Sequence, residues 1–82
     1  MRIELAPHGV LGRHEAVGDQ LFLVVAGDGT VSGDNQADTR IHAGMAACWS
    51  AGEMHETRAG EHGLVALVLE GQFTLGVEKQ AG

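Results

Sequence analysis

The feature that most constrains this chain is a series of short, apolar, β-rich runs that end at glycine. The two longest are "QLFLVVAG" (20–27) and "GLVALVLEG" (63–71), in a sequence with thirteen glycines and one proline. Runs of this length, rich in valine and leucine and bounded by glycine, are typical of buried strands. The second run could also form a buried helix, but its length and its flanking glycines favour a strand.

The rest of the sequence repeats this alternation of short strands and turns. Further strands are predicted at 2–5, 10–14, 30–32, 39–42, 45–49, 54–58 and 73–77. The segment "GDNQAD" supplies the turn of a hairpin that returns at 39–42. About nine strands at this spacing predict an all-β sandwich or barrel, followed by a frayed tail at 80–82.

The length of 82 residues predicts one domain, residues 1–82, near the lower size at which a hydrophobic core is stable alone. Cys48 is the single cysteine, so no disulfide can form within the chain, and no Cys/His ladder suggests a structural zinc. A short chain without such cross-links often gains buried surface from a second subunit. We therefore expect a homodimer or a higher homo-oligomer.

The charge of the chain excludes two classes of partner. A net charge of −6, with five scattered basic residues, argues against nucleic acid and against an anionic membrane surface. No apolar run has the length of a membrane span, and "MRIELAPHG" lacks the apolar stretch of a signal peptide. We expect a soluble cytoplasmic protein.

Two glycine-anchored segments, at about 12–27 and 44–55, resemble the two motifs of the cupin family. The first motif is usually written G(X)5HXH(X)3-4E(X)6G, and "RHEAVGDQLFLVVAG" is similar to it: His14 stands at the first histidine, Gln20 at the glutamate and Gly27 at the closing glycine. The second, G(X)5PXG(X)2H, is matched by "GMAACWSAGEMH", with Gly44, Gly52 and His55 in place. About sixteen residues separate the motifs, close to the shortest spacing in the family.

The resemblance covers roughly residues 10–70 and implies a small RmlC-like cupin, which is a jelly-roll barrel or double-stranded β-helix. It also implies a divalent metal ion in the barrel. Three positions depart from the family pattern: Ala16 replaces the second histidine, Gln20 the glutamate and Ser50 the proline. These departures leave two histidines and one amide where a cupin usually has four metal ligands.

Strand alternation predicts which side chains share the barrel interior. One face carries His14, Ala16, Gln20, Phe22, Val24 and Ala26, and another carries Glu53, His55 and Thr57. If both faces line the interior, then His14, Gln20, Glu53 and His55 converge on one site.

Two imidazoles with oxygen ligands suit Zn, Ni, Mn or Fe(II). Gln20 is a weak neutral ligand, and Glu53 is a candidate to replace the missing charge. The alternative is that the histidines only satisfy hydrogen bonds in a polar interior, and that Glu53, like Glu56, faces solvent.

The other reactive residues have simpler interpretations. His8, His42 and His62 are expected at the surface, and Cys48 is expected to be a small buried hydrophobe rather than a nucleophile. Trp49 and Phe22 are expected to pack in the core, with Trp49 also a candidate for the cavity mouth or an interface. "GDGTVSG" (27–33) lacks the Lys-Ser/Thr of a phosphate loop and is interpreted as a turn.

Three classes of function remain open at this point. The first is a metal-dependent cupin enzyme in which His14 and His55 hold the ion. The second is a non-catalytic module that binds a small molecule or an ion in a barrel mouth. The third is a scaffold or sensor with a degenerate site. We favour a metal-binding small cupin without an assigned reaction, because the fold alone does not define one.

Overall fold

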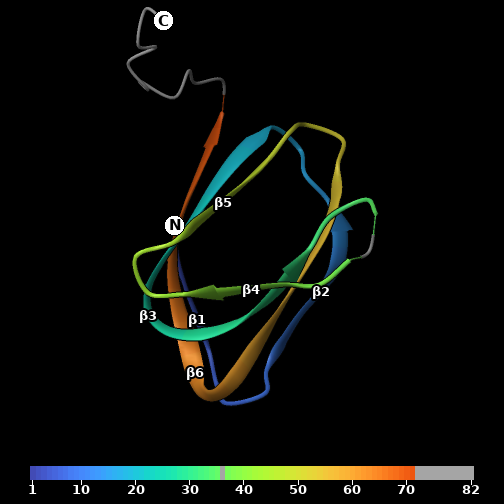
Figure 1. The fold of residues 1–82 in the computed structure, drawn as a ribbon. Helices are drawn as coiled ribbons and strands as arrows, with labels where there is room; N and C mark the ends of the chain where they lie inside the picture. The colour runs from blue at the N-terminus through green and yellow to red at the C-terminus, as the bar shows by residue number, and fades with distance from the viewer. Residues whose placement is uncertain (36, 72–82) are drawn as a thin grey trace, which may run out of the picture.

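The computed structural model describes residues 1–35 and 37–71, and their secondary structure consists of strands and turns (Figure 1). The strands are β1 (Arg2–Leu5), β2 (Val10–Glu15), β3 (Asp19–Ser32), β4 (Thr39–His42), β5 (Ala46–Trp49) and β6 (Met54–Gly71). Within these residues no helix is long and apolar enough to cross a membrane. The strand expected at 73–77 and the tail at 80–82 lie outside the described residues.

The two long strands, β3 and β6, form the centre of the structure and pair with each other in antiparallel register from Asp19↔Gly71 to Ser32↔Glu56. On the other side of β6, β1 pairs with its C-terminal part and β2 with its N-terminal part. On the other side of β3, β5 pairs with its N-terminal part and β4 with its C-terminal part. All these pairings are antiparallel.

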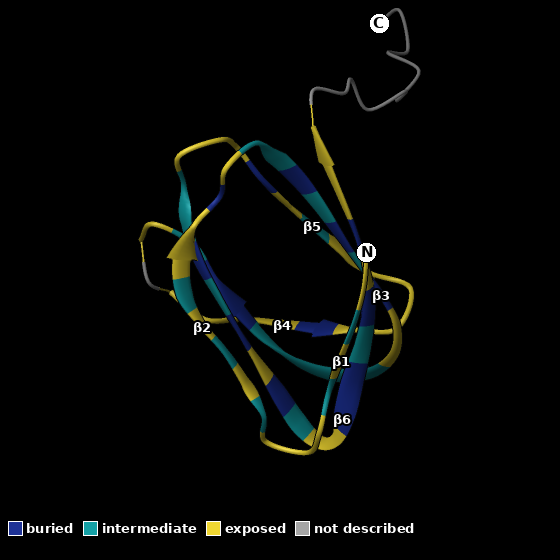
Figure 2. Ribbon diagram, turned by 180° about the vertical axis from the view of Figure 1, so that it is seen from behind, coloured by how far each residue is buried: buried dark blue, intermediate teal, exposed yellow. Residues whose placement is uncertain are grey.

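This pairing divides the molecule into two four-stranded halves. Half A contains β1, the C-terminal part of β6, the N-terminal part of β3 and β5; half B contains β2, the N-terminal part of β6, the C-terminal part of β3 and β4. Figures 1 and 2 show the chain closing into a ring of strands, so that the two halves face each other across the core. The expected all-β jelly-roll barrel is confirmed.

The number of strands differs from the prediction because glycines that were expected to end strands instead bend them. Gly27 and Gly63 both have positive φ, 79° and 75°, and lie inside β3 and β6. A Cβ at residue 27 would overlap the carbonyl oxygen of Gly63, so the two backbones can approach only because residue 27 has no side chain. Residues 27–32 of the "GDGTVSG" segment are therefore a bent part of β3 rather than a turn, and Gly33 follows the strand.

The core lies between the two halves and is built from alternate residues of each strand (Figure 2). Its buried apolar members are Ala16, Phe22, Val24, Val31, Ile41, Trp49, Ala59, Leu64, Ala66 and Val68. The predicted inward positions Gln20, Phe22 and Val24 are confirmed. Ala26 is exposed instead, because the register shifts by a bulge between Val24 and Ala26 and reverses the alternation there.

Thr57 provides a test of the packing of this core. Its side chain is 1% exposed, and its Oγ1 has no hydrogen-bond partner among the described residues. A buried hydroxyl without a partner costs free energy, whereas valine has the same shape and no polar atom. We expect Thr57→Val to raise the free energy of unfolding by about 1 kcal/mol in chemical denaturation.

Thr57→Ser is the matched control for this substitution. It keeps the hydroxyl and removes the methyl group, so it should lower the free energy of unfolding. A destabilised Thr57→Val protein would show that the hydroxyl makes a stabilising hydrogen bond.

Candidate functional site

The two histidines of the motifs lie side by side on neighbouring strands of half B. His14 on β2 and His55 on β6 are direct register partners. Their ring centroids are 4.2 Å apart, with the ring planes at 63°. His55 is 2% exposed, whereas His14 is exposed at the rim. The register of an edge strand against a central strand therefore brings together two residues that are far apart in sequence.

Both imidazoles are oriented through the same ring nitrogen. Nδ1 of His14 lies 2.7 Å from the carbonyl oxygen of Gly12, and Nδ1 of His55 lies 3.4 Å from the carbonyl oxygen of Glu53. A carbonyl oxygen only accepts hydrogen bonds, so each Nδ1 carries the proton. The neutral form of each ring then has its lone pair on Nε2, which is the arrangement that metal-binding histidines use.

Burial keeps His55 in this neutral form. Desolvation lowers the pKa of His55 below the ordinary imidazole value, and the nearby charges of His14 and Arg13 lower it further. The hydrogen bond to the Glu53 backbone and the charge of Glu53 act in the opposite direction, but the net pKa shift is downward. The inner histidine is thus available as a neutral donor at neutral pH.

The histidines line a cavity of about 280 Å³ between the two halves. Its other walls are Met1, Ile3, Leu11, Gln20, Phe22, Val68 and Glu70. Gln20, 8% exposed, approaches from half A, so the structure brings three of the four predicted site residues to one cavity. The cavity is mainly apolar, with a few converging polar groups, as in many small-molecule sites.

Glu70 is a cavity residue that the sequence analysis missed. It is the register partner of Gln20 and places a carboxylate on the same wall. Its position could have been found from alternation along β6, because Glu70 has the same parity as the buried residues Ala66 and Val68.

Glu53 lies elsewhere. It precedes β6 in a turn where Gly52 has a φ of 87°, so strand alternation does not extend to it. Its carboxylate accepts a hydrogen bond from the Ser50 backbone and lines a different pocket. A ligand role for Glu53 stays a prediction, and the proposal below does not use it.

Ala16, at the position of the family's second histidine, is buried but does not line the histidine cavity. Its backbone N–H donates to the carbonyl oxygen of Glu53, and its own carbonyl accepts from Gly52 N–H. These two bonds join the first motif, near its beginning, to the turn of the second.

The remaining candidates are placed as follows. His8, His42 and His62 are exposed, as expected, and Glu56 is half-buried on the opposite face of β6 from His55. Cys48, expected to be buried, is exposed. The reason is that its register partner, Leu21, has the outward parity of β3, so Cys48 also points outward.

Trp49 packs in the core, as expected, and supports the buried histidine. Its indole stacks on the ring of His55, with centroids 4.4 Å apart and planes at 19°. Phe22 contacts the indole edge-to-face at 5.7 Å. The stacked indole holds the ring of His55 in position, and Phe22 packs against the indole in turn.

The lowered pKa of His55 predicts how stability changes with pH. As pH falls through the ordinary imidazole pKa of about 6.5, the unfolded chain takes up a proton at residue 55 that the folded chain does not. The free energy of unfolding of the chelator-treated protein should therefore decrease as the pH is lowered through this range.

This slope should become shallower in His55→Gln and stay unchanged in His62→Gln, which removes an exposed imidazole. The measurement is a series of denaturant titrations across the pH range. An equal slope in the wild type and in His55→Gln would contradict the assignment.

Comparison with known proteins supports the fold. No protein-family model matches the chain, and no curated protein matches it. Among solved structures, a predicted oxalate decarboxylase from Thermotoga maritima aligns with a TM-score of 0.74 and 28% identity, over 82% of this chain and 59% of its own. A cupin superfamily protein from Desulfitobacterium hafniense aligns with a TM-score of 0.74 and 18% identity, over 82% and 60%. The DMSP lyase DddQ from Ruegeria pomeroyi aligns with a TM-score of 0.78 and 19% identity, over 96% and 39%.

The chain therefore has the cupin fold, a small double-stranded β-helix domain. The resemblance expected from the two glycine-anchored motifs is confirmed. The chain spans 59% and 60% of the length of the first two of these structures. Two of these structures are named for different reactions, as a predicted oxalate decarboxylase and a DMSP lyase, so the shared fold supports no single reaction.

Proposed function

We propose that this protein is a small cupin that binds one divalent metal ion in its barrel through His14 and His55, with Gln20 as a weak third ligand. No reaction is assigned to it. The observation that carries the proposal is the pair of neighbouring imidazoles that face one cavity, each with Nδ1 directed at a backbone carbonyl.

The donor set fits a borderline metal ion such as Zn, Ni, Mn or Fe(II). Imidazole nitrogen suits these ions, and the amide oxygen of Gln20 adds a neutral oxygen donor. The carboxylate of Glu70, beside Gln20, supplies negative charge to the same cavity. This set is less charged than one with a glutamate at residue 20, so we expect moderate affinity.

A bound ion would supply Lewis acidity to an oxygen atom of a small ligand. The protein's own residues define the rest of the site. Phe22, Val68 and Leu11 exclude water from the walls, and the amide of Gln20 can donate to or accept from a ligand. Trp49 fixes the orientation of His55 by stacking.

The alternative function is a non-catalytic cupin that binds a small molecule, or acts as a sensor, without a metal. One observation favours it: among residues 1–35 and 37–71, no group of three or more His, Cys, Asp and Glu side chains is placed to hold an ion. In that case the two histidines and Gln20 would serve as hydrogen-bonding groups in an otherwise apolar pocket.

Metal analysis distinguishes the two functions. Protein purified without an affinity tag should contain about one transition-metal ion per chain, and adding Zn²⁺, Ni²⁺, Mn²⁺ or Fe²⁺ to chelated protein should raise its melting temperature. His14→Ala and His55→Ala should each abolish binding, because each removes one of only two imidazole donors. Gln20→Glu should raise the affinity, because it restores a charged ligand.

Two variants serve as controls in the same titration. His62→Ala removes an exposed histidine and should change nothing, and Glu53→Gln tests the ligand role predicted for that residue. Metal content below a tenth of an equivalent, together with no thermal shift from any of the four ions, would contradict the metal proposal and favour the metal-free alternative.

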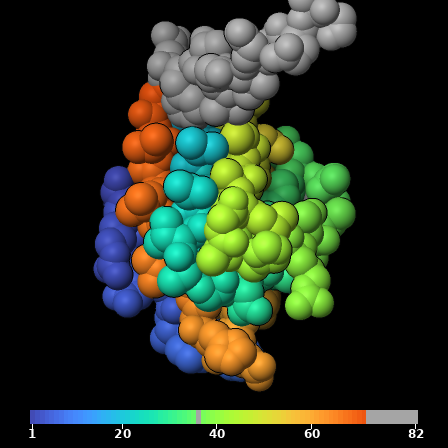
Figure 3. Space-filling view, turned by 60° about the vertical axis from the view of Figure 1, so that its left-hand side comes forward, coloured from blue at the N-terminus to red at the C-terminus, as the bar shows by residue number. Residues whose placement is uncertain are grey.

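We also propose that the protein is a homodimer joined through the outer face of half A. The outward positions of β3 and β6 carry Leu21, Leu23, Val25, Val65, Leu67 and Leu69, and Figure 3 shows β6, β3 and β5 side by side on one side of the molecule. Leu69 is 58% exposed. Exposed apolar patches of this kind are typical of interfaces.

A second copy of this chain is the partner that the charges of this face favour. At its edge, Arg2 and Glu4 on β1 pair with each other, 3.6 Å apart, so the face carries little net charge although the whole chain carries −6. Two identical apolar faces can meet around a two-fold axis without bringing like charges together.

Sedimentation at micromolar concentration tests this assembly. The wild type should sediment as a dimer, and Leu69→Glu should be largely monomeric, because it places a charge in the apolar face. Val17→Glu is the matched control: Val17 is 90% exposed and lies in the β2–β3 turn, so the same added charge should leave the dimer intact. A monomeric wild type would contradict the proposal.

A further inference from the structure

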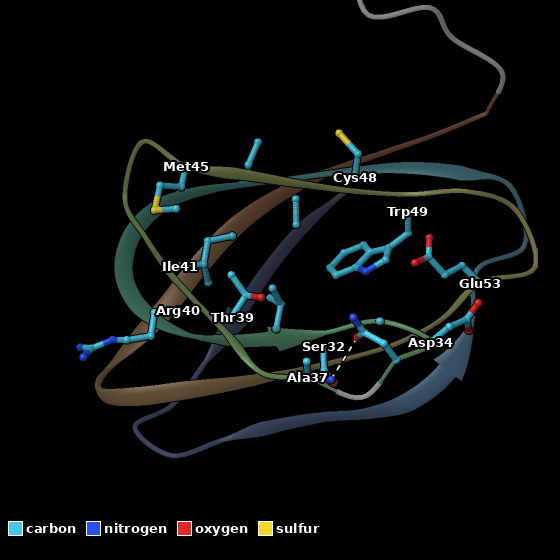
Figure 4. Close-up of a pocket in the computed structure, with 15 residues that line it drawn as sticks. Ser32, Asp34, Ala37, Thr39, Arg40, Ile41, Met45, Cys48, Trp49 and Glu53 are labelled. Atoms are coloured by element: carbon cyan, nitrogen blue, oxygen red, sulfur yellow. Dashed lines mark hydrogen bonds between the residues drawn. The ribbon is translucent and has the colours of Figure 1, made fainter.

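A second, larger pocket lies on the other side of Trp49, between the C-terminal part of β3, β4 and β5 (Figure 4). Its volume is about 490 Å³, within the ordinary range for small-molecule sites. Buried Val31 and Ile41 form an apolar part of the wall, and Trp49, Asp34 and Glu53 supply polar atoms. None of the metal ligands proposed above lines it.

Trp49 presents a hydrogen-bond donor to this pocket. The side chain is 95% buried, with an exposed fraction of 5%, and one face of its indole is covered by His55. Nε1–H makes no hydrogen bond to any residue in the described part of the chain, and Figure 4 shows the nitrogen on the side of the ring toward Ser32 and Asp34. The nitrogen atom itself is not sealed inside the protein, so its N–H is open to the pocket and can donate to a ligand atom that accepts.

Two carboxylates near this donor are fixed, and each has an oxygen to spare. One oxygen of Glu53 accepts from Ser50 N–H at 3.0 Å, and one oxygen of Asp34 accepts from Met54 N–H at 2.7 Å. The second oxygen of each carboxylate makes no hydrogen bond to another described residue. The pocket therefore offers one hydrogen-bond donor, the Trp49 N–H, and two acceptor carboxylates. Backbone N–H groups already hold both carboxylates in place.

Because Gly33 has no side chain, a ligand atom has space to reach the Glu53 carboxylate and the Trp49 N–H. A Cβ at residue 33 would lie 2.9 Å from Glu53 Oε2 and 3.7 Å from Trp49 Nε1. The absence of a side chain thus opens a position beside both atoms. A hydroxyl group suits that position, because it can accept from the indole N–H and donate to the carboxylate.

We propose that this pocket binds a hydroxylated small molecule of monosaccharide size, neutral or positively charged, through Trp49, Glu53 and Asp34. The two carboxylates disfavour an anion. Arg40, which also lines the pocket, extends away from Trp49 and Glu53 in Figure 4. Arg13 donates to Ser32 Oγ and to the carbonyl oxygen of Gly33 in the pocket wall, and its single positive charge offsets only one of the two carboxylate charges. Val31 and Ile41 suit the C–H face of a sugar ring.

Three sugars that share one ring but differ in charge test the proposal. D-glucose and D-glucosamine should bind, D-glucuronate should bind at least about tenfold more weakly, and the affinities can be measured by calorimetry. Trp49 is the single tryptophan of the chain, so its fluorescence should change when glucose or glucosamine binds. The titrations use chelator-treated protein, so that their result is independent of the proposed metal site.

Two substitutions locate the binding. Gly33→Ala fills the open position and should weaken glucose binding at least about tenfold, and its matched control is Gly12→Ala, whose Cβ would meet no atom within 4 Å. Glu53→Gln should also weaken binding, whereas Glu61→Gln, at an exposed glutamate, should not. The proposal is overturned if neither glucose nor glucosamine binds at tens of millimolar, if glucuronate binds as tightly as glucose, or if Gly33→Ala binds like the wild type.

Discussion

The close approach of β3 and β6 at Gly27 and Gly63 is the contact on which the rest of the structure depends. Both residues have positive φ, and a side chain at residue 27 would overlap the backbone of β6. The two bends turn one pair of long strands into the central strands of both halves of the barrel. Because of this, the histidines on half B face Gln20 and Glu70 on half A across one cavity.

Trp49 contacts both candidate sites, the buried histidine and the larger pocket. Its ring packs against His55, while its nitrogen edge belongs to the larger pocket beside Glu53. The burial that lowers the pKa of His55 and the wall that separates the two pockets thus come partly from one side chain. Phe22, which contacts Trp49 edge-to-face, lines the histidine cavity, so two touching aromatic residues each form part of the wall of one cavity.

The sequence was sufficient to predict the fold and the inward residues of regular strands. The motif spacing predicted the cupin fold, and alternation correctly placed Gln20, Phe22 and Val24 inside.

Alternation failed where the backbone is irregular: a bulge exposes Ala26, and the turn at Gly52 directs Glu53 into another pocket. Glycines within β3 and β6 looked like strand ends, because the sequence does not show whether a glycine stops a strand or bends it. Alternation along β6 would have placed Glu70 inside with Ala66 and Val68, but its pairing with Gln20, fifty residues away in the sequence, is visible only in the sheet register.

The position of β6 in the pairing order also determines when this domain can fold. β6 is the partner of β1, β2 and β3, and Arg2 near the start of the chain pairs with Leu67. Of the five strand pairings in the described residues, only β3–β4 and β3–β5 can therefore form before β6 has left the ribosome. Folding must then close long loops in one late step, as is typical of slow-folding β-proteins with contacts between distant residues. The earlier apolar strands, above all β3, are without their main partner during that time and are the segments that a chaperone would need to protect.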